Sequence, residues 1–152
     1  MSQENYYPLE AVKLIIAEAL RLGMAARKGF YDTPPEELVR TFNGCGPDSW
    51  TDSTRSAATW IYRNFQSPIG IHDDEFEHAD GKLETLKIVN DNFLANCKLQ
   101  LDDRYPLTAT WRVWRYPMRA AAWSKIQFAY FCLCNGSEEA WESAHERFQE
   151  TC

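Results

Sequence analysis

Cysteine and histidine are scarce in this sequence, and their distribution excludes several classes of protein. The five cysteines are odd in number and form no dense framework, which argues against a disulfide-built scaffold and favours a reducing compartment. Cys132 and Cys134 have neither zinc-finger nor thioredoxin spacing, so we expect no structural zinc site. None of the three histidines precedes His72, which counts against a His-Asp metallophosphohydrolase, because that class needs an upstream histidine ligand. A Gly-x-Ser-x-Gly motif is also missing, so a serine hydrolase is poorly supported.

Long apolar segments, a targeting sequence and a positive excess are missing as well. No run of eighteen apolar residues occurs, so we expect no transmembrane helix. The first ten residues contain acids and lack a basic n-region, so we expect no signal peptide. This pattern favours synthesis in the cytoplasm, with delivery by a virion or by non-classical export. The net charge of −6 argues against a protein whose whole surface binds nucleic acid.

The composition is that of a globular protein. The 152 residues fit a single domain, 1–152, and 45% of them are hydrophobic, which is enough for a sizeable core. The charge is distributed unevenly, because the segment 104–137 contains five basic residues and no Asp or Glu. Such a split indicates either an anionic partner on one face or a helix that shares its charge with acidic neighbours.

Helical periodicity predicts an all-α fold, a single-domain helical bundle. Apolar residues recur at helical spacing, no convincing alternating strand occurs, and proline, glycine and capping residues delimit the segments. We expect Gly29 to end the first helix, Ser67 to cap the fourth, and Pro117 to kink the sixth. The expected helices cover residues 9–28, 33–41, 52–65, 67–79, 82–101, 107–134 and 138–150.

A glycine-bearing loop, residues 42–47, precedes the helix that contains His72-Asp73-x-x-Phe76. Gly44 and Gly46 allow the backbone to turn so that several carbonyls point inward at one cation. Calcium accepts carbonyl and carboxylate oxygens, so this loop needs only one or two added carboxylates. The natural candidate for that carboxylate is Asp73.

The next predicted helix contains Asn90-Asp91-Asn92-Phe93. A histidine beside a calcium ion can act as a general base near neutral pH. It works best when a carboxylate holds its other ring nitrogen, a role that we assign to Asp91. His72 and Asp91 lie at similar distances on either side of the Gly81 turn, so two antiparallel helices would bring them face to face.

The sequence contains, in this order, the loop, a His-Asp-x-x-aromatic motif and an Asp-x-Phe motif. This order resembles calcium-dependent phospholipase A2, most closely its compact bacterial forms and the form in parvovirus capsid proteins. The resemblance covers roughly residues 42–97, about a third of the chain. It implies Ca²⁺-dependent hydrolysis of the sn-2 ester of glycerophospholipids, with His72 activating water and Asp91 orienting the histidine. The implied calcium ligands are Asp73 and the backbone carbonyls around Phe42, Gly44 and Gly46.

The sequence departs from the family pattern in four places. Phe76 stands where most relatives have tyrosine, no cysteine flanks His72, and the loop has fewer glycines than is usual. Asp74 follows Asp73 directly, so the sequence leaves open which of these acids binds the metal. The alternative function is therefore a phospholipase-like module that binds calcium, lipid or a protein partner without turnover.

Basic and aromatic residues alternate after residue 110. Arg112, Arg115 and Arg119 form a helical stripe beside Trp111 and Trp114. This combination suits the headgroup region of an anionic bilayer, so we expect a phospholipid membrane surface as partner. Packing of the tryptophans into the core is the simpler alternative, and the sequence indicates no particular oligomeric state.

Overall fold

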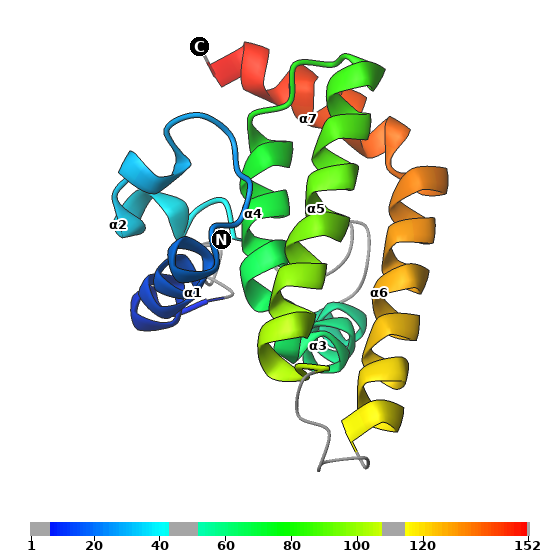
Figure 1. The fold of residues 1–152 in the computed structure, drawn as a ribbon. Helices are drawn as coiled ribbons and strands as arrows, with labels where there is room; N and C mark the ends of the chain where they lie inside the picture. The colour runs from blue at the N-terminus through cyan, green and yellow to red at the C-terminus, as the bar shows by residue number, and fades with distance from the viewer. Residues whose placement is uncertain (1–6, 43–51, 108–114, 152) are drawn as a thin grey trace.

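The computed structural model describes residues 7–42, 52–107 and 115–151. Within these ranges the chain forms α-helices and two short 3-10 helices and contains no strand, which confirms the predicted all-α class. The elements, labelled as in Figure 1, are α1 Leu9–Leu22, η1 Phe30–Asp32, α2 Pro35–Leu38, α3 Asp52–Ile61, η2 Arg63–Phe65, α4 Gln66–Glu77, α5 Leu83–Arg104, α6 Arg115–Gly136 and α7 Glu138–Thr151.

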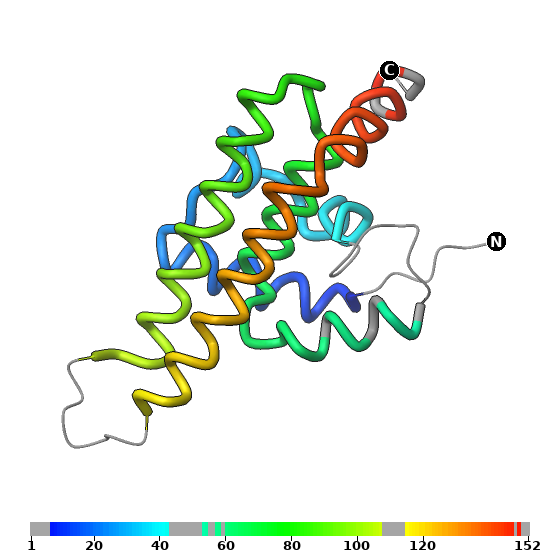
Figure 2. Tube along the Cα trace, turned by 90° about the vertical axis from the view of Figure 1, so that its right-hand side faces the viewer, coloured from blue at the N-terminus to red at the C-terminus, as the bar shows by residue number. Residues whose placement is uncertain are grey.

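Helices α4, α5 and α6 lie side by side, with α5 in the middle (Figure 1). Helices α1 and α2 lie on the far side of α4, and α7 crosses one end of the row, where it contacts α4, α5 and α6. Helix α6 therefore forms one edge of the molecule, and it crosses the front of the view in Figure 2. Helix α4, in contrast, packs against α1, α5 and α7 and lies in the interior.

The first helix ends earlier than predicted, at Gly23 and not at Gly29. Gly23 has a φ of +63°, a left-handed conformation that glycine adopts without a steric penalty. Its N–H donates to the Leu20 carbonyl at 3.1 Å, and the Met24 N–H donates to the Ala19 carbonyl at 3.0 Å. These two bonds satisfy carbonyls that the helix end would leave unpaired, which is why the helix ends there.

The longest helices are α5 and α6, with 22 residues each. The expected kink at Pro117 does not occur within the described part of α6, because Pro117 lies in its first turn. The N–H that proline lacks would have no intrahelical partner at that position. None of the helices in the described ranges is both long enough and apolar enough to cross a membrane.

Three clusters of buried apolar side chains hold the helices together. The first joins α1 to α4 through the segment 24–42, and Phe30, Phe42 and Ile71 belong to it. The second lies where η2 and α4 meet α5 and α6. The third packs Trp141 of α7 against the ends of α4 and α5 that meet at the Gly81 turn. Each cluster includes residues of α4 or of the turn that follows it, so the packing fixes that helix from several sides.

Candidate functional site

Helix α4 is buried along most of its length, which is unusual for a helix with this many polar residues. His72, Asp74 and Glu75 are all buried in it. Ser67, which we expected to cap the helix, instead donates its hydroxyl hydrogen to Glu18 of α1 at 2.7 Å. Because buried polar groups need partners, the environment of α4 is a set of specific hydrogen bonds and ion pairs.

The imidazole of His72 is enclosed on three sides. Its Nε2 lies 3.1 Å from Oδ1 of Asn90 on α5. The Phe76 ring lies on the same helix, with centroids 4.7 Å apart, and the Phe93 ring lies at 5.3 Å on α5. An amide oxygen only accepts hydrogen bonds, so Nε2 carries the proton and donates it. The remaining nitrogen, Nδ1, therefore has the lone pair.

Burial keeps His72 neutral. Desolvation lowers the pKa of its imidazole from 6.5 to about 4, and the hydrogen bond with Asn90 acts weakly in the opposite direction. Because Asn90 is uncharged, this hydrogen bond offsets the desolvation less than an ion pair with an acid would. At neutral pH the ring is therefore an uncharged hydrogen-bond acceptor at Nδ1.

We expected Asp91 to hold His72, but in the structure the two side chains do not meet. The Asp91 carboxylate accepts hydrogen bonds from Lys87 at 2.5 Å and from the Tyr130 hydroxyl at 2.7 Å. These two donors, Lys87 first, hold the pKa of Asp91 below its usual value. Successive residues on a helix point about 100° apart, so Asn90 faces α4 while Asp91 faces α6 and solvent. Asn90 is the residue that our interpretation of the sequence missed.

A signal for Asn90 is present in the sequence. The apolar stripe of α5 includes Leu86, Phe93 and Cys97, all buried. Asn90 is four residues after the first of these and three before the second, so it belongs to the same face of the helix. Asp91 lies outside this periodicity.

Asp74 and Asp73 have different environments. Asp74 is fully buried and pairs with the Arg27 guanidinium, with Nε–Oδ2 at 2.5 Å and Nη2–Oδ1 at 3.2 Å. The Thr41 hydroxyl donates to the same carboxylate at 3.2 Å. Asp73 is only partly buried. Because Asp74 is fully buried and ion-paired with Arg27, whereas Asp73 is partly exposed, Asp73 remains the candidate metal ligand that the sequence suggests.

Glu75 is a further buried acid beside this pair. Burial, and to a smaller extent the charge of Asp74, raise the pKa of its carboxyl to about 8, while Arg27 acts in the opposite direction. Asp74 and Glu75 lie beside a single guanidinium, and one arginine neutralises only one of two carboxylates. The Arg27 charge therefore does not keep the pKa of the buried Glu75 low. Glu75 is therefore protonated at neutral pH and adds no charge to the site.

The first residue of the expected calcium loop and the residue before it are fixed to α4 at two points. Phe42 is buried, and its ring lies so close to Gly70 that a Cβ there would be 2.6 Å from Cε2. Thr41 contacts Asp74 through the hydrogen bond described above. Gly70 and Asp74 flank His72 on α4, so the segment that precedes residue 43 ends against the helix that carries the candidate base. Gly44 and Gly46 themselves lie outside the described residues.

The described ranges contain no group of three or more His, Cys, Asp or Glu residues that could hold a metal ion. The expected calcium site uses one carboxylate and several backbone carbonyls, so it does not depend on such a group. Of its expected members, Asp73 and Phe42 are described, and both lie in or against α4.

The expected lipid-facing arginine stripe is described only in part. Trp111, Arg112 and Trp114 lie outside the described residues, and Arg115 is partly buried. Arg119 donates to the Tyr105 carbonyl at 2.8 Å and to the Asp102 carboxylate at 2.5 Å. This guanidinium therefore binds the C-terminal end of α5, where a cation is favourable, and we assign it a structural role in place of lipid contact.

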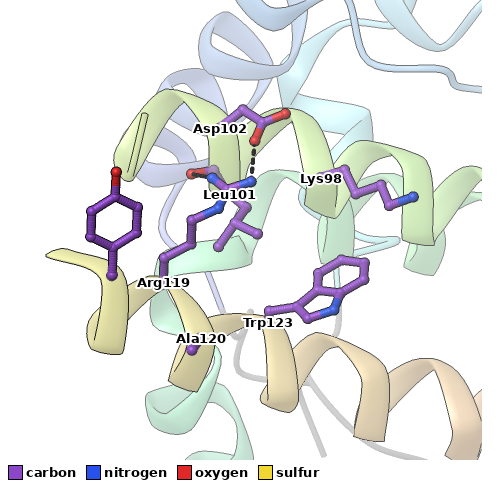
Figure 3. A pocket seen from close by; sticks show the side chains of 7 residues that line it. Lys98, Leu101, Asp102, Arg119, Ala120 and Trp123 are labelled. Carbon is purple, nitrogen blue, oxygen red and sulfur yellow. Dashed lines mark hydrogen bonds and ion pairs between the residues drawn. The ribbon is translucent and has the colours of Figure 1, made fainter. Parts of the chain in front are cut away.

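An open groove lies between α5 and α6, away from His72 (Figure 3). Its centre contains the pair of Arg119 and Asp102, and the ammonium of Lys98 lies 5.5 Å from the Trp123 ring centroid. The groove is lined by Lys98, Leu101, Asp102, Tyr116, Arg119, Ala120 and Trp123. It contains no acid and base in contact apart from that ion pair, so it is not a second candidate for the chemistry of His72.

Comparison with protein-family models, curated proteins and solved structures gives no match for this chain. The proposals below therefore rest on the motifs and on the geometry of the described residues.

Proposed function

We propose that this chain is a calcium-dependent ester hydrolase of the phospholipase A2 type, which cleaves the sn-2 ester of glycerophospholipids. The observation that carries the proposal is the environment of His72. Its imidazole is neutral, is held at one nitrogen by Asn90, and precedes the partly buried Asp73 on the same helix. A base with one fixed nitrogen beside a metal-binding carboxylate is the arrangement that metal-assisted ester hydrolysis requires.

In this mechanism His72 takes a proton from water through Nδ1. Asn90 accepts the Nε2 hydrogen, which fixes both the tautomer and the plane of the ring. The Asn90 oxygen also stabilises the imidazolium that forms, although less than a carboxylate would, because the amide has no net charge. The Phe76 and Phe93 rings keep water away from the other faces of the imidazole. The oxygen of that water attacks the sn-2 carbonyl carbon, and the ester C–O bond then breaks, so that the fatty acid leaves and the proton passes from Nδ1 to the lysolipid alkoxide.

Calcium, held by Asp73 and by the backbone carbonyls around Phe42, Gly44 and Gly46, would supply positive charge for the lipid phosphate and for the developing oxyanion. Two contacts support this location. The Phe42 ring packs on Gly70, and Thr41 bonds to Asp74, so the start of the loop is held beside Asp73.

The second candidate function is calcium or lipid binding without turnover. A general base is most effective when its pKa lies near the operating pH, and the pKa of His72 is about 4. The neutral partner Asn90 does little to raise it. With this low pKa, His72 is a weak base and the rate of ester hydrolysis should be low. The rate is therefore the quantity that separates the two candidate functions.

Fatty-acid release from mixed phospholipid vesicles, with and without calcium, tests the proposal. We expect His72→Ala to lower calcium-dependent release by about 10²–10⁴-fold, the usual effect of losing a general base, while calcium binding stays nearly unchanged. Asp73→Asn should remove both calcium binding and release. Asp103→Asn, which alters an exposed carboxylate paired with Arg21, serves as the matched control.

Calcium titration by melting temperature separates the two candidate functions. A ligand that binds only the folded state raises the melting temperature by mass action. Calcium-dependent stabilisation without ester release would favour the binding module. If the wild type showed neither stabilisation nor release, the phospholipase proposal would be wrong.

A further inference from the structure

The outward face of α6 carries a heptad seam. Its exposed residues follow one another at alternating spacings of four and three, which is the pattern that two packed helices need. At about 100° per residue, they fall within an arc of about 80° on the helix surface. Ala122 and Ile126, which are buried in the second core cluster, lie on the opposite side. The seam consists of Pro117, Ala121, Ser124, Phe128, Phe131 and Asn135.

This seam is uncovered and nearly uncharged. Phe128 and Phe131 are 65% and 64% exposed. Helix α6 forms one edge of the molecule in Figure 1 and crosses the front of Figure 2, where no described helix lies in front of it. Lys125, at the border of the seam, is the only charged residue among the exposed residues of α6. Two large rings exposed one helical turn apart mark an interaction surface.

The polar members of the seam already have partners in their own helix. The Ser124 hydroxyl donates to the Ala120 carbonyl at 3.0 Å, and the Asn135 amide nitrogen donates to the Phe131 carbonyl at 2.7 Å. Covering a polar group costs most when its hydrogen bond is lost. An apolar side chain can therefore pack over Ser124 without leaving its hydroxyl hydrogen unpaired.

A second copy of α6 fits the seam in the antiparallel direction, because the seam is self-complementary in size. With the two-fold axis level with residue 126, Phe128 lies opposite Ser124 of the second copy, and Phe131 lies opposite Ala121 of the second copy. Each ring then faces a small side chain, as the interdigitation of packed helices requires. A parallel pair would place Phe128 against Phe128 and Ser124 against Ser124, which would hold the helix axes apart at the rings.

The charge and the area of the seam suit a reversible dimer. The chain has a net charge of −6, but the segment 104–137 contains no Asp or Glu, so the two seams meet where neither copy is acidic. The four rings of a dimer would bury roughly 500 Å², and the smaller seam residues bring the contact to roughly 1,000 Å². That area is near the lower limit for a specific pair of proteins, so the dimer should dissociate readily.

A lipid bilayer fits the seam less well than a second helix does. The apolar strip is narrow, because Gln127 and Lys125 are exposed on either side of it and Ser124 lies within it. Helices that lie in a bilayer surface have a broad apolar face. A seam with 4-3 spacing and alternating large and small residues is typical of helix pairing.

We propose that this seam of α6 is the contact surface of a symmetric, antiparallel and reversible dimer of the chain. Helix α5 lies between α6 and α4, so the contact is separate from the His72 site. The proposal therefore goes beyond the proposed hydrolase activity and does not depend on it.

Sedimentation equilibrium over about 5–500 µM protein tests the proposal. We expect the wild type to dimerise with a Kd on the order of 10–100 µM, because the contact is small. Phe128→Ser/Phe131→Ser should raise the Kd by about 100-fold or more, since four rings lose their apolar contacts. The matched control is Leu14→Ser/Leu20→Ser on α1, whose side chains are 73% and 63% exposed. This control should dimerise like the wild type, and both variants should keep its melting temperature.

A charge pair tests the antiparallel contact directly. Ser124→Glu alone and Phe128→Lys alone should each weaken the dimer by about tenfold or more, because every contact of the variant then places a charge in the seam. In an equal mixture of the two variants, Glu at 124 faces Lys at 128, so the mixture should associate about tenfold more tightly than either variant alone.

Three results would overturn the proposal: a wild type that stays monomeric up to about 500 µM, a dimer that the phenylalanine variant leaves intact, or a mixture that associates no better than its components. A monomeric wild type that binds phosphatidylcholine vesicles through the same two rings would assign the seam to lipid. Failure of ester hydrolysis would leave these outcomes unaffected.

Discussion

The Asn90 amide oxygen lies 3.1 Å from Nε2 of His72, and both side chains are buried where α4 packs on α5. This hydrogen bond determines which ring nitrogen has the lone pair. Burial lowers the pKa of the imidazole to about 4, and the uncharged Asn90 amide raises it only in part. The chemistry available to His72 thus depends on a residue one position away from the acid that the motif suggested.

Replacing Asn90 should disable the site, whereas replacing Asp91 should not. Asn90→Ala leaves His72 without the group that orients its ring, and misplacement of a reacting group typically lowers the rate by about 100-fold. Asp91→Asn affects only the contacts with Lys87 and Tyr130. Measurement of kcat and KM for both variants checks this. The reverse order of effects would return the orienting role to Asp91.

The pH dependence of stability should reveal the buried imidazole. Folded His72 binds its proton only near pH 4, whereas the unfolded ring binds it near 6.5, so the unfolded state holds more protons between these values. The contribution of His72 to the free energy of unfolding therefore rises with pH across this window, levels off above it, and decreases as the pH falls through it. The expected contribution is about 3 kcal/mol. Urea unfolding of the metal-free protein at several pH values measures it.

His72→Gln is the control for this experiment. Glu75 has a raised pKa, so its contribution to stability is lost as the pH rises from about 4.5 to about 8, opposite in sign to that of His72. Both proteins contain Glu75, so the difference between their pH profiles isolates His72. Parallel profiles for the wild type and His72→Gln between pH 4 and 6.5 would contradict the low pKa.

Two ion pairs of equal length should differ in their effect on stability. The Arg27–Asp74 and Lys87–Asp91 pairs both have an N···O distance of 2.5 Å, but Asp74 is fully buried and Asp91 is 44% exposed. Asp74→Ala leaves the partly buried Arg27 without its partner and should lower the free energy of unfolding by about 3 kcal/mol. Lys87→Ala should produce little measurable change, because exposed pairs are screened by solvent. Chemical denaturation of both variants and of the wild type measures the two changes in the free energy of unfolding.

Gly70→Ala should displace Phe42. The added methyl group would be 2.6 Å from the Phe42 ring, in a core where overpacking typically lowers stability by about 1–3 kcal/mol. If the ring positions the calcium loop, calcium affinity should fall as well. A Gly136→Ala variant is the control, because among the described residues no atom beyond its chain neighbours and its own helical turn lies within 4 Å of the position that its Cβ would take. Unchanged calcium affinity in a destabilised Gly70→Ala protein would separate this packing from metal binding.

The helical class could be predicted from the sequence because it follows from local patterns. Leu86, Val89, Phe93 and Cys97 of α5 recur at helical spacing, and all four are buried in the structure, whereas Leu83 at the start of the helix is exposed. Helix ends were less predictable. Gly23 and Gly29 both have a positive φ, and the sequence does not show that the capping hydrogen bonds that end the first helix form at Gly23.

The sequence by itself determined the set of polar groups placed on helices that must pack together: His72, Asp73 and Asp74 on one, Asn90 and Asp91 on the other. Only the tertiary structure decided their pairings, because the pairing depends on how each helix is rotated about its axis. A shift of one residue turns a side chain by about 100°. That rotation is set by distant apolar contacts, such as Phe42 on Gly70 and Trp141 on Phe76, which bring together residues far apart in the chain. As a result Asn90 contacts His72, Asp91 contacts Tyr130, and Asp74 is paired with Arg27.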